Sequence, residues 1–476
     1  MQIKPNTKNT TSIYIKSLEI KNLRTFGDVV LEFEKPDGTL PRWTLILGDN
    51  GIGKSSLLQC IAWMKPDLPD QNDDLGQNIK KSAIEPTINF EENETLERLV
   101  RKGINVEKEH TFIKGIFLGG HKLPGKKLPK GAPWCYSSMK IELGADHKLK
   151  DVHHKFDTNS DDLFLTNEVF IFAYSASRVL GKANLNEAYM KDTITSFLTD
   201  STVLYDAEEV LHTINYAAFG ADENEKEKYQ KYLSSVKQAF KSILPDIQAE
   251  TDIEITTPKL VKNQIKQGEI LITTRHGKKI AFKDFSLGYK TVMSWIVDLS
   301  WRLFNEFPKS KDPFKEPAIC IVDEVDLHLH PKWQRDIIQN LSEHFPNIQF
   351  IATAHSPLMV QAALRENYAV LRLGQSGVDI LNEPKGIDGW RVDQILTSEF
   401  FDLKTSRGIE YEEMLRRQQE LNRIKKPTKA QREELDELTQ KMTEFPIGEN
   451  PEEIENRKLI SEVVEKIKTK KIKIEL

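Results

Sequence analysis

The chain has few cysteines, no long apolar run and no excess of positive charge. Its three cysteines, Cys60, Cys135 and Cys320, show no metal-binding spacing and are expected to be reduced thiols. No apolar run in the 476 residues is long enough to cross a membrane, and the N-terminus carries no secretory pattern. A net charge of −5 excludes a uniformly basic nucleic-acid coat. These absences predict a cytoplasmic protein without membrane contact, in which any DNA contact comes from local patches.

Apolar runs and helical periodicity alternate along the chain, which predicts an α/β fold. Charged residues make up 29% and hydrophobic residues 39%, which suits a globular protein of two or three domains. The runs at 43–47, 318–322 and 348–353 predict buried strands, with helices expected at 55–64 and 333–344. Strands and helices in this succession, joined by right-handed crossovers, form a sheet with a parallel core.

The most informative stretch is Gly48-Asp-Asn-Gly-Ile-Gly-Lys-Ser55, which lies between a predicted strand and a predicted helix. Glycines let its backbone N–H groups wrap a phosphate chain at a helix N-terminus, which favours anions. Lys54 can reach the β- and γ-phosphates, and the Ser55 hydroxyl can bind Mg²⁺. A glycine-rich turn without a ligand is the alternative, but strand, loop, Lys-Ser and helix follow in the order of a nucleotide-binding loop. The residues expected to contact ATP are Gly48, Asn50, Gly51, Gly53, Lys54, Ser55 and Ser56.

Two acidic residues follow the apolar run at 318–322. Asp323 at the tip of this predicted strand can hold Mg²⁺ opposite Ser55, and Glu324 can polarise a water aimed at the γ-phosphate. Two carboxylates after a strand are a weak motif when they occur alone. Because they follow a nucleotide-binding loop here, they predict that the bound ATP is hydrolysed.

A histidine follows the next apolar strand, in Gln349-Phe-Ile-Ala-Thr-Ala-His355. His355 could hydrogen-bond a γ-phosphate from this position, although a lone histidine is more often structural. Its order after the two earlier motifs favours the functional interpretation. Glu324, His355 and Lys54 are therefore the residues expected to act in catalysis.

A second anion-binding surface is expected at Ser286 and Gly288, which open the helix that precedes the Asp323 strand. One triphosphate does not need two phosphate-binding surfaces within one chain. The sequence therefore predicts a head-to-tail dimer, in which Ser286 and Gly288 of each subunit close over the nucleotide of the other.

This set of motifs resembles the ABC-type ATPase heads of the RecF/SMC-like group, closely over residues 12–64 and 280–360. Asn22-Leu-Arg24-Thr-Phe26 is similar to the opening motif of that group, which implies that Arg24 lies near the nucleotide. Phe285-Ser-Leu-Gly stands where the group more often has Leu-Ser-x-Gly, and keeps the serine and the glycine. The glutamine of the family's Q-loop has no clear counterpart, and Tyr174-Ser-Ala-Ser-Arg178 occupies a similar place in chain order.

Within that group, three segments most resemble the PtuA family of anti-phage defence ATPases, which occur in Septu systems and beside some retrons. They are Ser286-Leu-Gly-Tyr-Lys with Asp298-Leu-Ser-Trp-Arg302, Leu327-His-Leu-His-Pro331-Lys-Trp-Gln-Arg335 and Ile395-Leu-Thr-Ser398-Glu-Phe-Phe401. The resemblance implies a homodimer or higher oligomer of ATPase heads that forms a complex with a separate HNH nuclease, PtuB. It also implies nucleic acid, either DNA or retron nucleic acid, as a ligand.

The sequence offers modest support for nucleic-acid and partner surfaces. Lysines that could touch phosphate lie in a glycine-proline loop and near the C-terminus, although lysine runs are usually only solvated. They are Lys122, Lys126, Lys127, Lys130 and the run at 466–473. Residues 409–445 predict a helical hairpin that could dock the nuclease.

Other members of the wider group differ in ways that the sequence tests. Overcoming-lysogenization-defect nucleases carry a Toprim domain with an Asp-x-Asp pair, and residues 356–476 contain no such pair. The region between the nucleotide-binding loop and Ser286 lacks the sustained heptads of long SMC arms. We therefore expect neither an intrinsic nuclease nor long arms. A RecF-like DNA-repair ATPase without a nuclease partner, and a DNA-binding scaffold with negligible hydrolysis, remain alternatives.

The predicted architecture is an ABC-type ATPase head in which an inserted region interrupts a mixed or parallel sheet. Residues 1–95 would form the N-terminal part of the head, and residues 96–250 an inserted α/β and helical region. Residues 251–384 would complete the head with the signature, the two acids and the histidine. Residues 385–476 would form a helical segment that binds the partner. The predicted function is nucleotide-dependent dimerisation that controls DNA engagement and the nuclease, with ATP and Mg²⁺ as cofactors.

Overall fold

The protein is described from a computed structural model, which divides into two compact units, Met1–Phe401 and Asp402–Leu476. The described residues are 12–67, 85–86, 96–120, 125–127, 130–164, 167–183, 193–198, 202–244, 246–261, 264–266, 268–363, 366–375, 377–382, 389–401, 403–425, 427–443 and 445.

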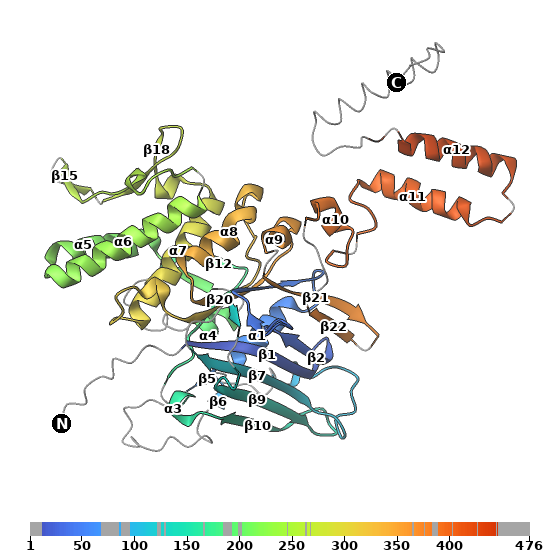
Figure 1. The fold of residues 1–476 in the computed structure, drawn as a ribbon, viewed down its shortest axis with the longest axis horizontal. Coiled ribbons are helices and arrows are strands. Elements are labelled where there is room, and N and C mark those ends of the chain that lie inside the picture. The colour runs from blue at the N-terminus through green and yellow to red at the C-terminus, as the bar shows by residue number, and fades with distance from the viewer. Residues whose placement is uncertain are drawn as a thin grey trace, which may run out of the picture. The chain divides into compact units, whose positions relative to one another are not determined.

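The first unit is built on a mixed sheet of eleven strands (Figure 1). In spatial order the strands are β10 (Leu149–Thr158), β9 (Trp134–Leu143), β7 (Thr111–Gly120), β1 (Ser12–Leu23), β2 (Phe26–Glu32), β22 (Gly377–Asn382), β21 (Asn367–Gly374), β4 (Trp43–Leu47), β20 (Ile348–Thr353), β19 (Ala318–Val322) and β11 (Ile171–Tyr174). From β21 to β11 all neighbours pair in parallel. From β2 to β10 they pair antiparallel. The predicted mixed α/β fold is therefore confirmed.

The central strands are buried on both faces, so their side chains alternate between two hydrophobic cores. In β4, Trp43, Leu45 and Leu47 lie in one core, whereas Ile46 lies in the other. β19 divides in the same way, with Cys320 in the first core and Ile319 in the second. Continuous apolar runs in the sequence are the consequence of this two-sided burial.

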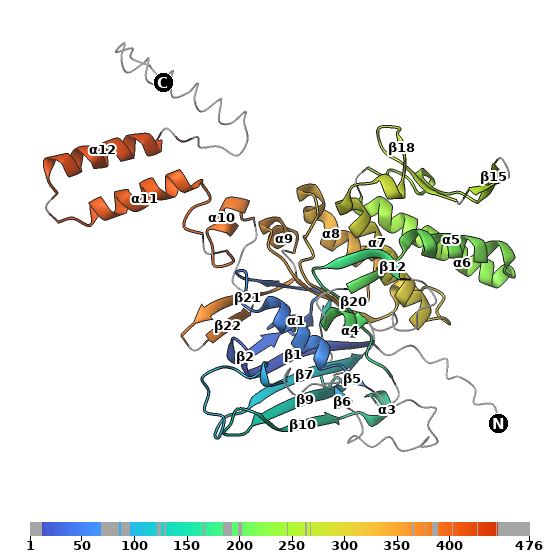
Figure 2. The same cartoon turned by 180° about the vertical axis from the view of Figure 1, so that it is seen from behind.

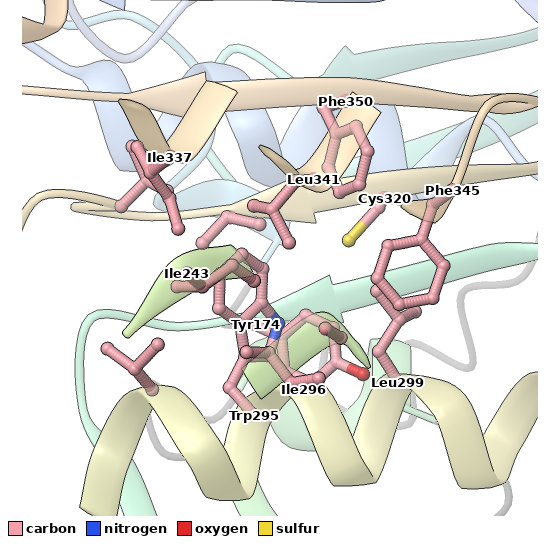
Figure 3. Packing of buried hydrophobic residues seen from close by; sticks show 14 of the residues in the cluster. Tyr174, Ile243, Trp295, Ile296, Leu299, Cys320, Ile337, Leu341, Phe345 and Phe350 are labelled. Carbon is pink, nitrogen blue, oxygen red and sulfur yellow. The ribbon is translucent and has the colours of Figure 1, made fainter. Parts of the chain in front are cut away.

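The first core lies between the parallel strands and four helices, which Figures 1 and 2 show on one side of the sheet. The helices are α5 (Ala207–Gly220), α6 (Glu223–Ile243), α7 (Leu287–Glu306) and α8 (Pro331–His344). In Figure 3, α7 turns Trp295, Ile296 and Leu299 into the same cluster as Tyr174 and Cys320 of the sheet. α7 is thus held against the strands by a continuous apolar contact.

The second core lies between the other face of the parallel strands and the antiparallel strands β1, β7 and β9. It encloses α1 (Lys54–Trp63) and α4 (Thr193–Leu198). Gly115 of β7 lets α1 come close, because a Cβ there would lie 2.8 Å from the Cβ of Met64, just beyond the helix. The sheet therefore continues through β7, β9 and β10, which come from the region that the sequence predicts as an insertion.

Short elements complete the first unit. The strands outside the large sheet are β3 (Thr39–Leu40) with β8 (Lys126–Lys127), β5 (Pro66–Asp67) with β6 (Glu85–Pro86), β12 (Arg178–Ala183) with β13 (Thr202–Tyr205), β14 (Ile253–Ile255) with β17 (Ile270–Thr273) and β18 (Lys279–Ala281), and β15 (Lys259–Val261) with β16 (Gln264–Lys266). The short helices are α3 (Asp161–Phe164), α9 (Pro357–Ala362), α10 (Val392–Leu396) and the 3₁₀ turns η3 (Glu250–Asp252), η4 (Phe282–Asp284) and η5 (Pro313–Lys315).

The second unit contains the helical hairpin that the sequence predicts, formed by α11 (Ile409–Asn422) and α12 (Lys429–Thr443). Arg417 of α11 donates to both carboxylate oxygens of Glu434 of α12, at 2.7 and 3.0 Å. Arg417 also pairs with Glu420 within α11. This bidentate contact fixes the register of the two helices.

No helix among the described residues is both long enough and apolar enough to span a bilayer. Of the predicted lysine patches, Lys126, Lys127 and Lys130 are exposed, whereas Lys122 and the run at 466–473 lie outside the described residues.

Candidate nucleotide site

The loop at 48–55 joins the carboxyl end of β4 to the first turn of α1. Gly48, Gly51 and Gly53 have φ values of 141°, 75° and 115°, which lie in the region that glycine adopts most readily. Glycine is also required at position 48 for steric reasons, because a Cβ there would lie 2.8 Å from the carbonyl oxygen of Leu371. Gly53 is the N-cap of α1 and offers no side-chain cap, so the N–H groups of the first turn can receive an anion.

Lys54 folds back over the loop. Its Nζ donates to the carbonyl oxygens of Gly48 and Asp49, at 2.7 and 2.9 Å, and the residue is buried. Burial lowers the pKa of Lys54, while the carboxylates of Asp323 and Glu324 oppose this shift. The ammonium group therefore lies over the loop, and the oxygens of a bound phosphate could replace its two carbonyl partners. Asn50, Gly51 and Ser55 are exposed at the rim of the same loop.

Asp323 meets the loop from β19. Its Oδ2 accepts a hydrogen bond of 2.6 Å from the Ser55 hydroxyl, and its Oδ1 accepts one of 2.5 Å from Thr353. The tertiary structure thus brings together Ser55 and Asp323, the two residues expected to hold Mg²⁺, although 268 positions separate them in the sequence. Thr353, the last residue of β20, is a contact that sequence reasoning missed. The one feature of the sequence that could have identified Thr353 is its position as a polar residue at the end of an apolar strand.

Hydroxyl and carboxylate oxygens are the donors that Mg²⁺ prefers, so Ser55 and Asp323 fit this ion. Mg²⁺ uses few protein ligands and completes its shell with phosphate oxygens and water. A pair of protein oxygens beside a phosphate-binding loop is therefore a sufficient protein contribution.

Glu324 has a left-handed backbone conformation, with φ of 49°. Its N–H donates to the Thr353 hydroxyl at 2.7 Å, so Thr353 contacts both acidic residues. The Glu324 carboxylate and the His355 ring, both about one-third exposed, lie with Oε1 and Nε2 4.0 Å apart. Glu324 and His355 are therefore adjacent, and their side chains open toward solvent at the ends of neighbouring strands.

Asp326 fixes the segment that carries His355. Its Oδ2 accepts from the backbone N–H groups of His355 and Ser356, at 2.9 and 2.7 Å. The Ser356 hydroxyl donates to Gln334 of α8 at 2.6 Å, and Gln334 donates to the carbonyl of Leu329. The sequence analysis missed these contacts of Asp326. The one feature that could have pointed to them is a third acidic residue two positions after Glu324.

Arg24 lies beside the first turn of α1. Its Nη1 donates to the Ser56 hydroxyl at 2.6 Å and to Gln59 Oε1 at 3.0 Å. Arg24 has a φ of 48°, and its N–H donates to the carbonyl of Leu99 at 2.7 Å. The structure therefore places Arg24 next to Ser56 at the edge of the loop.

Arg178 follows the carboxyl end of β11 and reaches the two acids from the other side. Its Nη1 donates to the carbonyl of Asp323 at 2.9 Å, and its Nη2 to the carbonyl of Glu324 at 3.1 Å. The sequence indicated only that Tyr174-Ser-Ala-Ser-Arg178 occupies a place in chain order similar to that of the family's Q-loop. The structure assigns a definite set of contacts to its arginine.

Ser286 and Gly288 lie at the start of α7, apart from these contacts. Among the described residues, no hydrogen bond joins either of them to residues 48–56. A Cβ on Gly288 would lie 2.6 Å from the carbonyl of His328, so glycine lets α7 approach the segment after Glu324. Both residues line an open cavity of about 560 Å³ with Arg275, His328, His330 and Lys332, among others. Ser286 and Gly288, the signature residues expected from the sequence, therefore form a surface that is separate from the loop at 48–55 within one chain.

Comparison with protein families identifies the larger part of the chain. The model of a family described as an AAA ATPase domain matches residues 14–360. This range includes the loop at 48–55, both acids and His355.

Two relatives that align over most of this chain share about a quarter of the aligned residues with it. The Septu protein PtuA of Bacillus mycoides (strain KBAB4) is 24% identical over 441 residues, which cover 91% of this chain and 51% of that protein. The Retron Vc95 probable ATPase of Vibrio cholerae serotype O1 biovar El Tor is 23% identical over 398 residues, covering 76% of this chain and 74% of its own length. The chain thus spans about half the length of the Bacillus relative.

Solved structures align at lower similarity. The SMC head domain from Thermotoga maritima aligns with 78% of this chain and 99% of its own, at 14% identity and a TM-score of 0.37.

Proposed function

Because this chain belongs to the AAA ATPase domain family, we propose that it binds and hydrolyses ATP at the loop 48–55. One observation carries the proposal. Ser55, in the first turn of α1 after β4, meets Asp323, Glu324 and His355 at the carboxyl ends of the adjacent strands β4, β20 and β19. Ligands of open α/β sheets bind at such ends, and here the residues provide a phosphate-binding loop, hard oxygen ligands and the carboxylate of Glu324 beside His355.

Each residue has a distinct task in this proposal. The N–H groups of the loop and Lys54 bind the phosphate chain. Ser55 and Asp323 would hold Mg²⁺, which would supply positive charge beside the phosphates. Glu324 orients the attacking water and accepts its proton, because its carboxylate is about one-third exposed and lies beside the site. His355, braced through its backbone by Asp326, contacts the γ-phosphate. Arg24 holds the first turn of α1 through Ser56.

The separate position of Ser286 and Gly288 supports a composite site made by two copies of the chain. The N-terminus of α7 has no side-chain cap, and it opens into the cavity at Gly288 with Lys332 nearby and with Arg275, which is paired with Asp246 at 2.9 Å. A helix N-terminus with cationic neighbours suits a phosphate. In a head-to-tail dimer, Ser286 and Gly288 of one copy would reach the nucleotide bound by the other, as in the ABC-type heads that the motifs resemble.

The biological setting that we propose is an anti-phage defence complex in the cytoplasm. Two relatives carry the names of a Septu protein and a retron ATPase. ATP-dependent dimerisation would then control how the complex engages DNA and a separate HNH nuclease. The hairpin of α11 and α12 is the proposed docking element, since its helices keep exposed faces outside their mutual contact.

The substitution Glu324→Gln tests hydrolysis. We expect ATP affinity within about threefold of the wild type and turnover reduced by about 100-fold or more, since a positioned base contributes this much. Glu343→Gln, at an exposed position of α8, is the matched control and should turn over normally. Unchanged turnover in the Glu324 variant would refute the assigned role.

Sedimentation of the Glu324→Gln variant with ATP and Mg²⁺ tests the composite site. We expect a shift to a dimer or a larger assembly that Ser286→Arg abolishes. Asn224→Arg, which adds the same side chain on the exposed first turn of α6, should leave the shift intact. A shift that survives Ser286→Arg would exclude the signature surface from the interface.

Purification of the tagged chain from its native host tests the defence setting. Recovery of an HNH nuclease that is lost when residues 402–476 are deleted would support the proposal. A homodimer without a nuclease would instead favour a DNA-repair ATPase. Turnover near background in the purified complex, with and without DNA, would favour a scaffold.

A further inference from the structure

Arg178 lies at the start of β12, just beyond β11, at the end of the stretch Tyr174-Ser-Ala-Ser-Arg178 to which the sequence assigns no role. Its guanidinium donates three hydrogen bonds to backbone carbonyls, those of Ser175 at 3.0 Å, Asp323 at 2.9 Å and Glu324 at 3.1 Å. We propose that Arg178 is a positioning residue, which sets the backbone of Asp323 and Glu324 for hydrolysis. This inference rests on the proposed ATP hydrolysis.

The backbone that Arg178 holds is unusual at Glu324. Its φ of 49° is a conformation that residues with a side chain rarely adopt. Such a conformation persists only where its surroundings over-determine it. Here the Thr353 hydroxyl accepts from the N–H of Glu324, and Arg178 donates to its carbonyl oxygen. Both sides of the residue are therefore fixed by side chains from other strands.

This turn decides where the Glu324 carboxylate lies. β19 ends at Val322, and the left-handed turn carries Glu324 toward His355, with the two side chains 4.0 Å apart. If the turn relaxed to a right-handed conformation, the side chain would leave the Cα in a different direction. A water-orienting carboxylate must keep its position within about 1 Å to retain most of its effect. Holding the turn is therefore a catalytic requirement.

A guanidinium suits this task better than an ammonium group. Its planar nitrogens present several donors at fixed angles, whereas an ammonium group is a compact point donor. Two of its nitrogens reach the carbonyls of successive residues, Asp323 and Glu324, at the same time. Burial lowers the pKa of Arg178, while the nearby carboxylates of Asp323, Glu324 and Asp326 oppose this shift. The guanidinium therefore also offsets three negative charges at the end of the sheet.

Two other roles make different predictions. If Arg178 bound a phosphate directly, its replacement would weaken ATP binding at least as much as turnover. If it only stabilised the fold, its replacement would lower the melting temperature without a selective effect on turnover. A positioning role predicts loss of turnover with retained affinity.

The test compares Arg178→Lys with the wild type and with Arg391→Lys, a surface arginine whose pairing with Asp393 is half exposed. We expect Arg178→Lys to lower kcat by about 10- to 100-fold, as displacements of about 1 Å do, with ATP affinity changed less than about threefold. Arg178→Ala should lower kcat further than Arg178→Lys does. Added guanidinium ion at low millimolar concentration should restore part of the turnover of Arg178→Ala. An unchanged kcat, or an equal loss of affinity, would overturn the inference.

Hydrogen exchange provides a readout that needs no turnover. In the full-length protein, amides of residues 321–328 should exchange faster in Arg178→Lys than in the wild type, while residues 48–56 keep their protection. Unchanged exchange at 321–328 would overturn the positioning role even if ATP hydrolysis itself could not be measured. If the wild type showed no turnover but Arg178→Lys still exchanged faster at residues 321–328, the proposed hydrolysis would be refuted. The conclusion that Arg178 holds this segment in place would then remain.

Discussion

A buried ion pair on α7 provides a quantitative test of how the signature helix is attached to the sheet. Asp298 is fully buried, and Arg302, one turn later, is 4% exposed. Arg302 Nε donates to Asp298 Oδ2 at 2.6 Å. The same carboxylate accepts from the Tyr174 hydroxyl at 2.9 Å and from the Tyr205 backbone N–H at 2.8 Å. One carboxylate therefore joins α7 to β11 and β13.

The expected cost of removing this carboxylate is large. Asp298→Ala leaves the buried guanidinium of Arg302 without its carboxylate, and breaking buried pairs in this way costs about 3–5 kcal/mol. Tyr174→Phe removes a single hydrogen bond to a charged group, which costs about 1.5–3 kcal/mol. Burial raises the pKa of Tyr174 well above its ordinary value, so its hydroxyl remains a donor across the usual pH range. A domain has only about 5–15 kcal/mol of total stability, so Asp298→Ala should be close to unfolding at 37 °C.

Urea unfolding of a double-mutant cycle checks the reasoning. Arg302→Met alone should also be costly, because it leaves a buried carboxylate, but the double variant should cost less than the sum by more than about 1.5 kcal/mol. The exposed pair Arg372 and Glu399 is the control, with coupling below about 1 kcal/mol. Tryptophan fluorescence and circular dichroism should report the same transition for this comparison to hold. Additivity within about 0.5 kcal/mol at Asp298 and Arg302 would refute the argument.

Three further substitutions or reagents address the site and the core. Thr353→Val removes the hydroxyl that contacts Asp323. Turnover should fall by about 10- to 100-fold, because residues that orient a metal ligand contribute about this much. Unchanged ATPase kinetics would contradict this. Gly48→Ala should lower the free energy of unfolding by about 1–3 kcal/mol, because its Cβ would crowd the Leu371 carbonyl. ATP should also no longer raise the melting temperature of this variant. A normal ATP-induced shift would show that the loop tolerates a methyl group. The three cysteines should resist Ellman's reagent until denaturant is added, since all are buried and burial raises the pKa of Cys60 to about 12; rapid labelling of the native protein would disprove this.

Much of the site could be predicted because its motifs are local. A glycine-rich loop, a Lys-Ser pair and a following helix are adjacent in sequence, and their chemistry depends on one turn of backbone. The strands that end at Asp323 and His355 are continuous apolar runs, because parallel strands are buried on both faces. The predicted strands at 318–322 and 348–353 are confirmed to the residue. The helix expected at 55–64 is present as Lys54–Trp63.

The supporting contacts could not be predicted, because they join residues that are far apart in the sequence. Thr353, Asp326 and Arg178 act through hydrogen bonds to the backbone or side chains of other strands. A lone threonine, aspartate or arginine at a strand end has no spacing that sets it apart from ordinary surface polarity. Their partners are known only once the order of strands in the sheet is known.

The amino-acid sequence by itself determined the chemical parts of this protein, which are the phosphate loop, the two acids, the histidine and the separate serine-glycine surface. The tertiary structure decided how those parts meet. It brought Ser55 to Asp323 across the sheet, set Glu324 in a left-handed turn between Thr353 and Arg178, and continued the sheet through β7, β9 and β10. The physical reason is that local motifs encode which atoms can bind phosphate, whereas the pairing of distant strands and the burial of their side chains encode where those atoms lie.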